Sequence, residues 1–282
     1  MTPTGSTTAG GKRMKEKMKQ PLHDHKLVWN PWIGCTKASP GCKNCLMYLQ
    51  QTARHVSPSP QVIRRCTSTW DRPGKWQREA YRQNTARPAF VCGYSDFFLA
   101  EADGWRPEAW SIIRDCPNIF FLIQTKRTER ILSHLPSDWG NGYGNVALGA
   151  SVESKKYLSR IPQLRAVPSA TLRYLDICPC LESMVPDLGE YLEGIGWVIV
   201  AGETGCGITD DWRPFDLQWA RDIRDLCRKR NIPFRFGHTA GKARNPSHLL
   251  DGQVYHELPE IYPKDAVSPD EKQTGRRYAG GK

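Results

Sequence analysis

The sequence predicts an α/β fold built on a parallel sheet, because short apolar runs alternate with stretches that carry a helical pattern. Six runs are rich in apolar and β-branched residues: 89–92, 119–123, 146–152, 172–175, 197–201 and 233–236. Continuous runs of this kind fit strands that are buried on both faces, as parallel strands are. Alternation of strand and helix implies a parallel sheet, which is either open or closed into a barrel.

The clearest helical pattern lies at 217–230, between the last two runs. Five apolar residues fall on one face of a helix there, while the charged residues fall mostly elsewhere: Leu217, Ala220, Ile223, Leu226 and Cys227. This spacing predicts an amphipathic helix that packs on the sheet. Shorter helices are predicted at 108–114 and 127–132.

The length and composition fit a reduced, soluble protein. The chain has 282 residues with 39% hydrophobic and 24% charged content, and it contains no apolar run near the length of a membrane span. Basic residues near the N-terminus are not followed by an apolar segment, which argues against secretion. Ten cysteines without an export signal then indicate cytoplasmic, reduced thiols and favour a metal or cluster over disulfides.

The termini differ from the rest of the chain in charge and pattern. Residues 1–26 are predicted to be a flexible basic arm, residues 27–263 an α/β domain, and residues 264–282 a flexible tail. The net charge is +11, of which the two ends carry +6. Basic ends suggest a polyanionic partner such as DNA or RNA, and the alternative is that they are solvated ends that aid solubility.

Three cysteines, Cys35, Cys42 and Cys45, form a C-x6-C-x2-C motif within one short segment. Gly34 and the Pro40-Gly41 pair are turn residues, which let thiolates from one loop converge on one centre. Three thiolates can hold three irons of a [4Fe–4S] cluster and leave the fourth iron without a protein ligand. An open iron can bind a substrate or cofactor.

Zinc is the alternative ligand of these thiolates. A structural zinc site needs four ligands, and Cys66 and His55 are the nearest candidates for the fourth. Neither completes a second paired motif. The third interpretation is that the cysteines are free thiols.

Polar residues follow each of the six apolar runs, where the strands are predicted to end. Because the carboxyl ends of parallel strands meet at one edge of a sheet, chemistry gathers there. The segments begin at these residues in turn: Gly93, Gln124, Glu153, Asp176, Gly202 and Gly237. The sequence therefore predicts a functional site at this edge.

Five segments taken together resemble the phage Gp37/Gp68 family, which is similar to a divergent branch of the radical S-adenosylmethionine enzymes. They are 29–45, 94–98, 124–127, 148–153 and 197–205. The resemblance covers about residues 27–260. It implies a partial (β/α) barrel with the cysteine loop after the first strand, a [4Fe–4S] cluster and S-adenosylmethionine as cofactors, and a 5′-deoxyadenosyl radical made from them.

The resemblance also implies roles for single residues at the strand ends. The expected cofactor contacts are Ser95, Asp96, Lys126, Glu153, Gly202 and Glu203. Lys126 is expected to pair with a carboxylate or with a substrate phosphate. Two of the others have a structural alternative: Asp96 as a helix cap and Gly202 as part of a glycine turn that ends a strand.

Cys178, Cys180 and His238 are expected to act in catalysis, the thiols as hydrogen-atom donors and the histidine as a proton carrier. The alternative for these three is that the cysteines are simply buried and the histidine hydrogen-bonded.

The function that the resemblance implies is a radical S-adenosylmethionine enzyme in the host cytoplasm. Its expected substrate is a modified base in phage DNA, such as an amino-acyl-thymine that it isomerises or modifies. An external electron donor and a partner enzyme are the other expected partners, and no membrane is. The alternatives are a non-enzymatic iron–sulfur or zinc protein that binds nucleic acid, and an electron-transfer protein, which the missing fourth cysteine disfavours.

Overall fold

A seven-stranded parallel sheet forms the frame of the protein. The structure is a computed structural model, and it describes residues 27–53, 59–168, 171–205, 207–241 and 247–263. The strands of this sheet follow one another in chain order: β1 (Leu27–Trp29), β4 (Arg87–Val91), β5 (Ile119–Thr125), β6 (Val146–Ser151), β7 (Leu172–Ile177), β8 (Trp197–Val200) and β9 (Phe234–Phe236). Neighbouring strands pair in parallel throughout.

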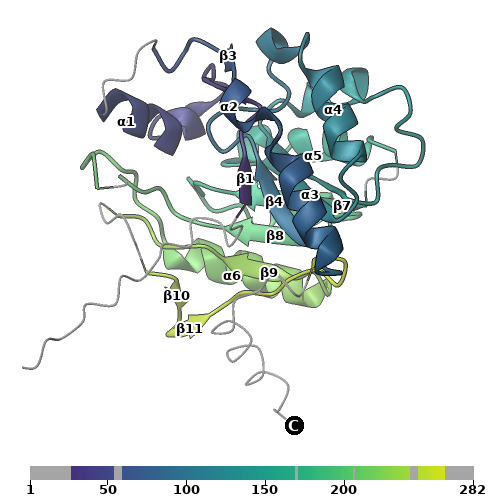
Figure 1. Ribbon diagram of the computed structural model, residues 1–282. Coiled ribbons are helices and arrows are strands. Elements are labelled where there is room, and N and C mark those ends of the chain that lie inside the picture. Colours follow the sequence, from purple (N-terminus) through teal and green to yellow (C-terminus); the bar gives the residue numbers. More distant parts are fainter. Residues whose placement is uncertain (1–26, 54–58, 169–170, 206, 242–246, 264–282) are drawn as a thin grey trace, which may run out of the picture.

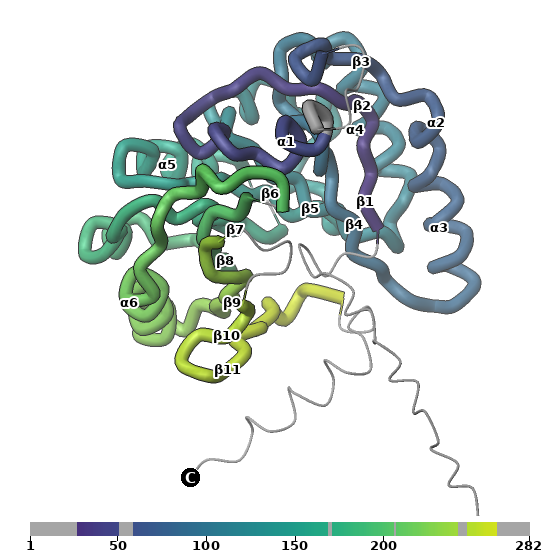
Figure 2. Tube along the Cα trace, turned by 90° about the vertical axis from the view of Figure 1, so that its left-hand side faces the viewer, coloured from purple at the N-terminus to yellow at the C-terminus, as the bar shows by residue number. Residues whose placement is uncertain are grey.

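The sheet curls into a half-barrel whose two edges, β1 and β9, do not meet (Figure 2). The prediction of a partial (β/α) barrel is therefore confirmed at the level of architecture. Two small antiparallel pairs lie outside this sheet: β2 (Trp32–Ile33) with β3 (Arg64–Arg65), and β10 (Leu249–Leu250) with β11 (Gln253–Val254).

Six helices connect the strands within the described residues (Figure 1): α1 (Leu46–Ala53), α2 (Thr67–Trp70), α3 (Arg72–Arg82), α4 (Arg106–Arg114), α5 (Arg160–Arg165) and α6 (Leu217–Lys229). Short 3₁₀ segments occur at Pro40–Cys42, Ala100–Ala102, Thr128–Arg130, Leu132–His134, Lys155–Tyr157 and Asp187–Tyr191. Helix α6 begins after Asp216, whose carboxylate accepts a hydrogen bond from the Gln218 backbone N–H at 2.8 Å.

All six predicted strands are present, as are the helices predicted at 217–230 and 108–114. The helix predicted at 127–132 is wrong, because two 3₁₀ segments stand there. The backbone N–H of Ile131 bonds to Thr128, only three residues back. The carbonyl of Arg130, which an α-helix would pair with residue 134, instead faces the side chains of Ser133 and His134. Such local side-chain bonds compete with α-helix formation.

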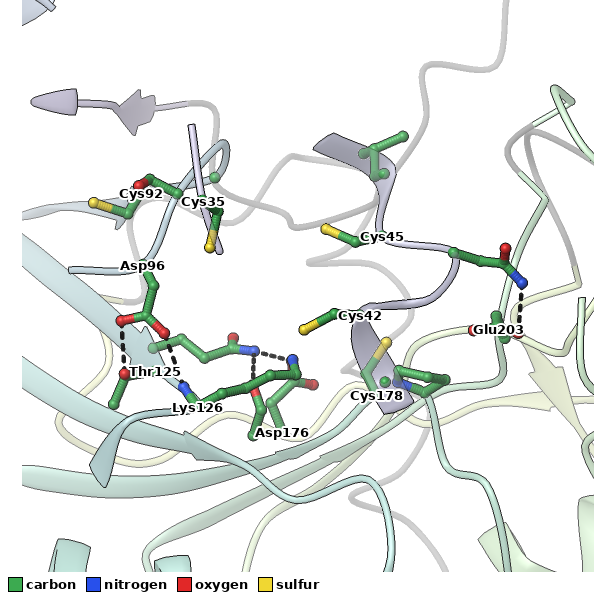
Figure 3. Close-up of a pocket in the computed structure, with 18 of the residues that line it drawn as sticks. Cys35, Cys42, Cys45, Cys92, Asp96, Thr125, Lys126, Asp176, Cys178 and Glu203 are labelled. Carbon is green, nitrogen blue, oxygen red and sulfur yellow. Dashed lines mark hydrogen bonds between the residues drawn. The ribbon is translucent and has the colours of Figure 1, made fainter. Parts of the chain in front are cut away.

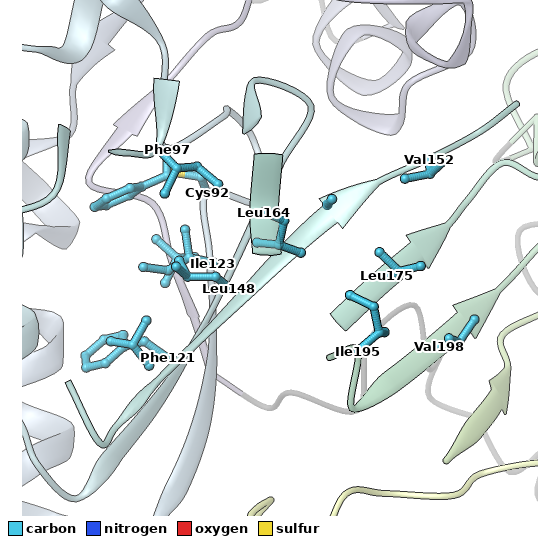
Figure 4. Close-up of a cluster of buried hydrophobic side chains, with 14 of the residues drawn as sticks. Cys92, Phe97, Phe121, Ile123, Leu148, Val152, Leu164, Leu175, Ile195 and Val198 are labelled. Atoms are coloured by element: carbon cyan, nitrogen blue, oxygen red, sulfur yellow. The ribbon is translucent and has the colours of Figure 1, made fainter. Parts of the chain in front are cut away.

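The outer face of the half-barrel packs against the helices and carries the main hydrophobic core (Figure 4). Alternate residues of β5, namely Ile119, Phe121 and Ile123, point to this side and are fully buried. Helix α6 buries Ala220, Ile223 and Cys227 in this core, as the amphipathic pattern predicts.

The inner face of the half-barrel is apolar near the amino ends of the strands and polar near their carboxyl ends. Its apolar part consists of Phe120, Leu122, Ala147, Leu172, Tyr174, Trp197 and Tyr262. The Tyr174 ring lies directly over Gly149, where an added Cβ would come within 2.2 Å of the ring. Two residues beyond Leu122, Gly149 and Tyr174, at the next inward-facing positions, stand the polar residues Gln124, Ser151 and Asp176. The same alternation thus closes one end of the half-barrel and leaves a polar floor at the other.

The predicted arm at 1–26 and the predicted tail at 264–282 lie outside the described residues. Within the described residues, no helix is both long and apolar enough to cross a membrane.

Candidate functional site

A cavity of about 230 Å³ lies at the carboxyl ends of the strands, between the sheet and the cysteine loop (Figure 3). We define the cysteine loop as residues 34–45. Ten of the residues expected from the sequence to form the site line this cavity: Cys35, Cys42, Cys45, Ser95, Asp96, Lys126, Cys178, Gly202, Glu203 and His238. The motif at 35–45 and the scattered strand ends therefore meet at one place.

The cysteine loop crosses the top of the half-barrel from the β4 side to the β8 side. It begins at Gly34, whose φ of +92° and contact with the Val62 carbonyl leave no space for a Cβ. Near its middle, Gly41 packs directly on the buried carboxylate of Glu153, at the end of β6. It ends at Cys45, immediately before α1. The three thiols consequently lie above the carboxyl ends of the strands.

On the β4 and β5 side, Asp96 and Arg127 hold the loop. The Arg127 guanidinium donates to Asp96 Oδ2 at 3.1 Å and to the Thr36 carbonyl and hydroxyl oxygens at 2.7 and 2.8 Å. Ser95 adds a hydrogen bond from its hydroxyl to the Gly34 carbonyl at 2.6 Å. Ser95 and Asp96 are the two residues expected to contact the cofactor. Both stabilise the loop beside Cys35, Ser95 directly and Asp96 through Arg127.

The β8 side uses Glu203 in the same way. Its carboxylate accepts from the Arg213 backbone N–H and Nε, both at 2.9 Å, and from the Asn44 side-chain amide at 3.0 Å. The pKa of Glu203 is lowered even though burial acts to raise it, because the Arg213 and Asn44 hydrogen bonds favour the charged form. Gly202 is needed where it stands, since a Cβ there would lie 2.3 Å from the Ala240 nitrogen.

Lys126 brings a positive charge into the cavity. Among the described residues, no carboxylate lies within ion-pair distance of its ammonium group. Burial acts to lower the pKa of Lys126, but the negative charges of a Cys42 thiolate and of the Glu153 carboxylate outweigh this and raise the pKa. The side chain therefore remains a cation, facing an interior that holds three thiols.

The thiols of Cys35 and Cys45 favour their protonated form in the chain alone. Burial raises the pKa of Cys35 to about 12, with Asp96 adding to the effect and Arg127 opposing it. Burial also raises the pKa of Cys45, although Lys126 opposes it. Thiolates are the form that binds metals, so a bound metal must displace these protons.

The polar floor below the thiols contains residues that the sequence analysis named only as strand-end residues. Gln124 donates its amide hydrogens to Ser151 Oγ at 2.7 Å and to the Asp176 carboxylate. Burial raises the pKa of Asp176 to about 6, although Lys126 opposes the shift. These residues continue the inward-facing rows of β5, β6 and β7, and that period is the signal that could have identified them.

The expected catalytic residues are not equivalent. Cys178 and His238 line the cavity, but Cys180 does not, and its thiol donates to the Glu182 carbonyl at 3.3 Å. Burial raises the pKa of Cys178 well above its usual range and lowers that of His238 to about 4. Both side chains are therefore neutral near pH 7.

Glu153, expected to contact the cofactor, lies behind the cysteine loop and does not line the cavity. It is fully buried, and it pairs with Arg160 at 2.8 Å through one oxygen. Its second oxygen has no hydrogen-bond partner among the described residues.

Metal binding can be tested against the arrangement of the thiols. Within the residues that the structure describes, no three His, Cys, Asp or Glu side chains are close enough together to hold one metal ion. The thiols of Cys35, Cys42 and Cys45 surround the cavity instead (Figure 3). Of the two candidates for a fourth zinc ligand, Cys66 does not line the cavity and His55 lies outside the described residues.

Comparison with known proteins identifies a family. A family model described as a protein of unknown function, DUF5131, matches residues 22–280. The chain belongs to the DUF5131 family. No curated protein and no solved structure matches it. The DUF5131 match does not link the chain to the phage Gp37/Gp68 family, so that resemblance stays a prediction.

The raised pKa of Asp176 predicts a pH dependence of stability. A buried carboxyl with a pKa near 6, against 3.8 ordinarily, is favoured in its neutral form. Its contribution is fully present below about pH 4 and is lost as the pH rises through 6. Relative to wild type, Asp176→Asn should therefore gain about 2 kcal/mol in free energy of unfolding between pH 4.5 and 7.5.

Urea denaturation of the metal-free protein at the two pH values measures this difference. Asp71→Asn, at an exposed carboxyl, is the matched control and should show no such change. An equal difference between Asp176→Asn and wild type at both pH values would contradict the assignment.

Proposed function

We propose that this protein is a radical S-adenosylmethionine enzyme that uses a [4Fe–4S] cluster held by Cys35, Cys42 and Cys45. The observation that carries the proposal is that these three thiols line one cavity at the carboxyl ends of a parallel half-barrel. That edge is where parallel α/β proteins place their chemistry.

The residues present fit a cluster better than a single ion. In a cluster each thiolate binds a different iron, so three thiols spread around a cavity suit it. A zinc ion instead requires its ligands to converge on one point at about 2.1–2.3 Å. Lys126 supports the same proposal, because its ammonium group favours the deprotonated form of Cys45.

When bound, the cluster and S-adenosylmethionine would supply one-electron cleavage of the sulfonium and a 5′-deoxyadenosyl radical. In this proposal Lys126 binds a carboxylate or phosphate in the cavity, since its charge is not taken up by a neighbouring acid. Cys178 offers a protonated thiol as a hydrogen-atom donor, and neutral His238 offers a proton acceptor in the same cavity. Cys180 stays a weaker candidate, because its thiol is bonded away from the cavity.

The thiols predict the metal content directly. Anaerobically reconstituted protein should contain about four irons and four sulfides per chain and should cleave S-adenosylmethionine to 5′-deoxyadenosine after reduction. Replacing Cys35, Cys42 or Cys45 by alanine should abolish both, as measured by iron analysis and chromatography.

Cys116→Ala, at a buried thiol outside the cavity, is the matched control and should retain both. A colourless protein that holds one zinc ion, and loses it in Cys66→Ala, would favour the zinc-binding alternative and contradict the proposal.

Lys126 predicts a separation of cofactor affinity from cluster content. Lys126→Met should keep its iron after full reconstitution, because the three cysteines that bind the cluster are unchanged. It should bind S-adenosylmethionine about 10- to 100-fold more weakly, because a charge-assisted hydrogen bond of about 1.5–3 kcal/mol is lost. Equilibrium dialysis with labelled cofactor measures the affinity. Lys155→Met, which removes an exposed cation, is the control. Unchanged affinity in Lys126→Met would show that this ammonium does not contact the cofactor.

The substrate that we propose is a modified base in phage DNA, such as an amino-acyl-thymine, with an external reductant supplying the electron and a partner enzyme possible. The net charge of +11 supports a polyanionic substrate. DNA binding should weaken steeply with salt, and deletion of residues 1–20, which contain Lys12, Arg13, Lys15, Lys17 and Lys19, should flatten that dependence without stopping cofactor cleavage.

Fluorescence anisotropy across a salt series measures DNA binding. Absence of binding at low salt, with turnover of free small molecules, would point to a nucleotide or metabolite substrate instead.

A further inference from the structure

We propose that Arg127 and Asn44 are positioning residues that set the thiols at the two ends of the cysteine loop separately, Arg127 acting on Cys35 and Asn44 on Cys42 and Cys45. What the placed thiols are for rests on the proposed function. The placement of the thiols does not depend on the proposed function, because it follows from contacts within the chain itself.

The first anchor is the Asp96–Arg127–Thr36 chain of contacts. The guanidinium uses one arm for Asp96 and the other for both oxygens of Thr36, the residue next to Cys35. The side chains of Arg127 and Asp96 are only 13% and 8% exposed, so water does not compete freely for these bonds. A planar guanidinium can bridge the two partners at once, which a lysine ammonium cannot do in the same geometry.

Asp96 is itself fixed on all sides. Besides Arg127, its two oxygens accept from the Thr125 hydroxyl at 2.7 Å, the Phe98 N–H at 2.9 Å and the Lys126 N–H at 3.0 Å. A carboxylate offers about four acceptor positions, and four donors fill them here. Asp96 is therefore held in the orientation that positions Arg127.

The second anchor is the Arg213–Glu203–Asn44 chain of contacts. The Asn44 amide, next to Cys45, donates to Glu203 Oε2 at 3.0 Å and also to the Asp211 carbonyl. Arg213 holds the Glu203 carboxylate from its backbone and its side chain. The neighbouring Lys43–Asp211 pair at 2.8 Å is exposed, with side chains 49% and 70% accessible, and so contributes little.

The two anchors stand at different strand ends, β5 and β8, with β6 and β7 between them. No hydrogen bond or ion pair within the described residues joins the side chains of one anchor to those of the other. Tyr48, on α1, bonds to the Cys35 carbonyl and so ties the main chain at the two ends of the loop. The side-chain anchors nonetheless act at opposite ends, which predicts local rather than shared effects.

Thiol labelling of the reduced, metal-free full chain tests this. In a short N-ethylmaleimide pulse read by peptide mass spectrometry, Arg127→Met should raise labelling of Cys35 about tenfold and of Cys42 and Cys45 less than about twofold. Asn44→Ala should do the reverse. Arg127→Lys should behave like Arg127→Met, because the charge alone cannot span both partners. Arg114→Met, which breaks an exposed ion pair, should change nothing.

Equal rises at all three thiols, or no rise, would overturn the proposal. Labelling of buried Cys116 and Cys227 would show that Arg127→Met has unfolded. In that case Thr36→Val, which removes the hydroxyl that Arg127 binds, is tested instead, and it must raise the labelling of Cys35 selectively. Iron content is measured separately, so wild type without iron but with the expected labelling would defeat the proposed function and leave this inference standing.

Discussion

The buried ion pair between Asp96 and Arg127 is the interaction on which the site depends. It joins the end of β4 to the end of β5 and reaches the cysteine loop through Thr36. A buried pair of this kind is costly to break, because removing one partner strands the other charge away from water at about 3–5 kcal/mol. The free energy needed to separate the pair therefore stabilises one position of a loop that contains glycine and proline.

An open half-barrel creates the need for such anchors. A closed barrel would surround its central cavity with strands, but β1 and β9 do not meet here, and the cysteine loop spans the top instead. It contacts the ends of β4, β5, β6 and β8 in turn. Four separate strand ends thus define where the three thiols stand.

The sequence predicts the strands well and the hydrogen-bond partners of the polar residues poorly. Continuous apolar runs such as 119–123 identify strands because burial on both faces leaves a strong pattern. Asp96 and Glu203 were expected at the site and are there, but a sequence does not show whether a carboxylate faces a ligand or a nearby arginine. Arg213 is ten residues beyond Glu203, and Asn44 is more distant still, so only folding brings them together. Gln124 and Asp176 need the register of β5, β6 and β7 to be recognised as one floor.

Apart from the two carboxylates that are paired with arginines, the cavity contains little charge. Asp96 and Glu203 are neutralised by arginines, the buried thiols and His238 are neutral near pH 7, and Asp176 titrates near pH 6. Lys126 remains as a cation whose charge no described acid takes up within ion-pair distance. Below about pH 6, where Asp176 is protonated, a cavity with this balance attracts anions, and Lys126 lowers the cost of converting Cys45 to a thiolate. The same ammonium group would thus favour assembly of a thiolate-bound cluster and then be positioned to hold an anionic group beside it.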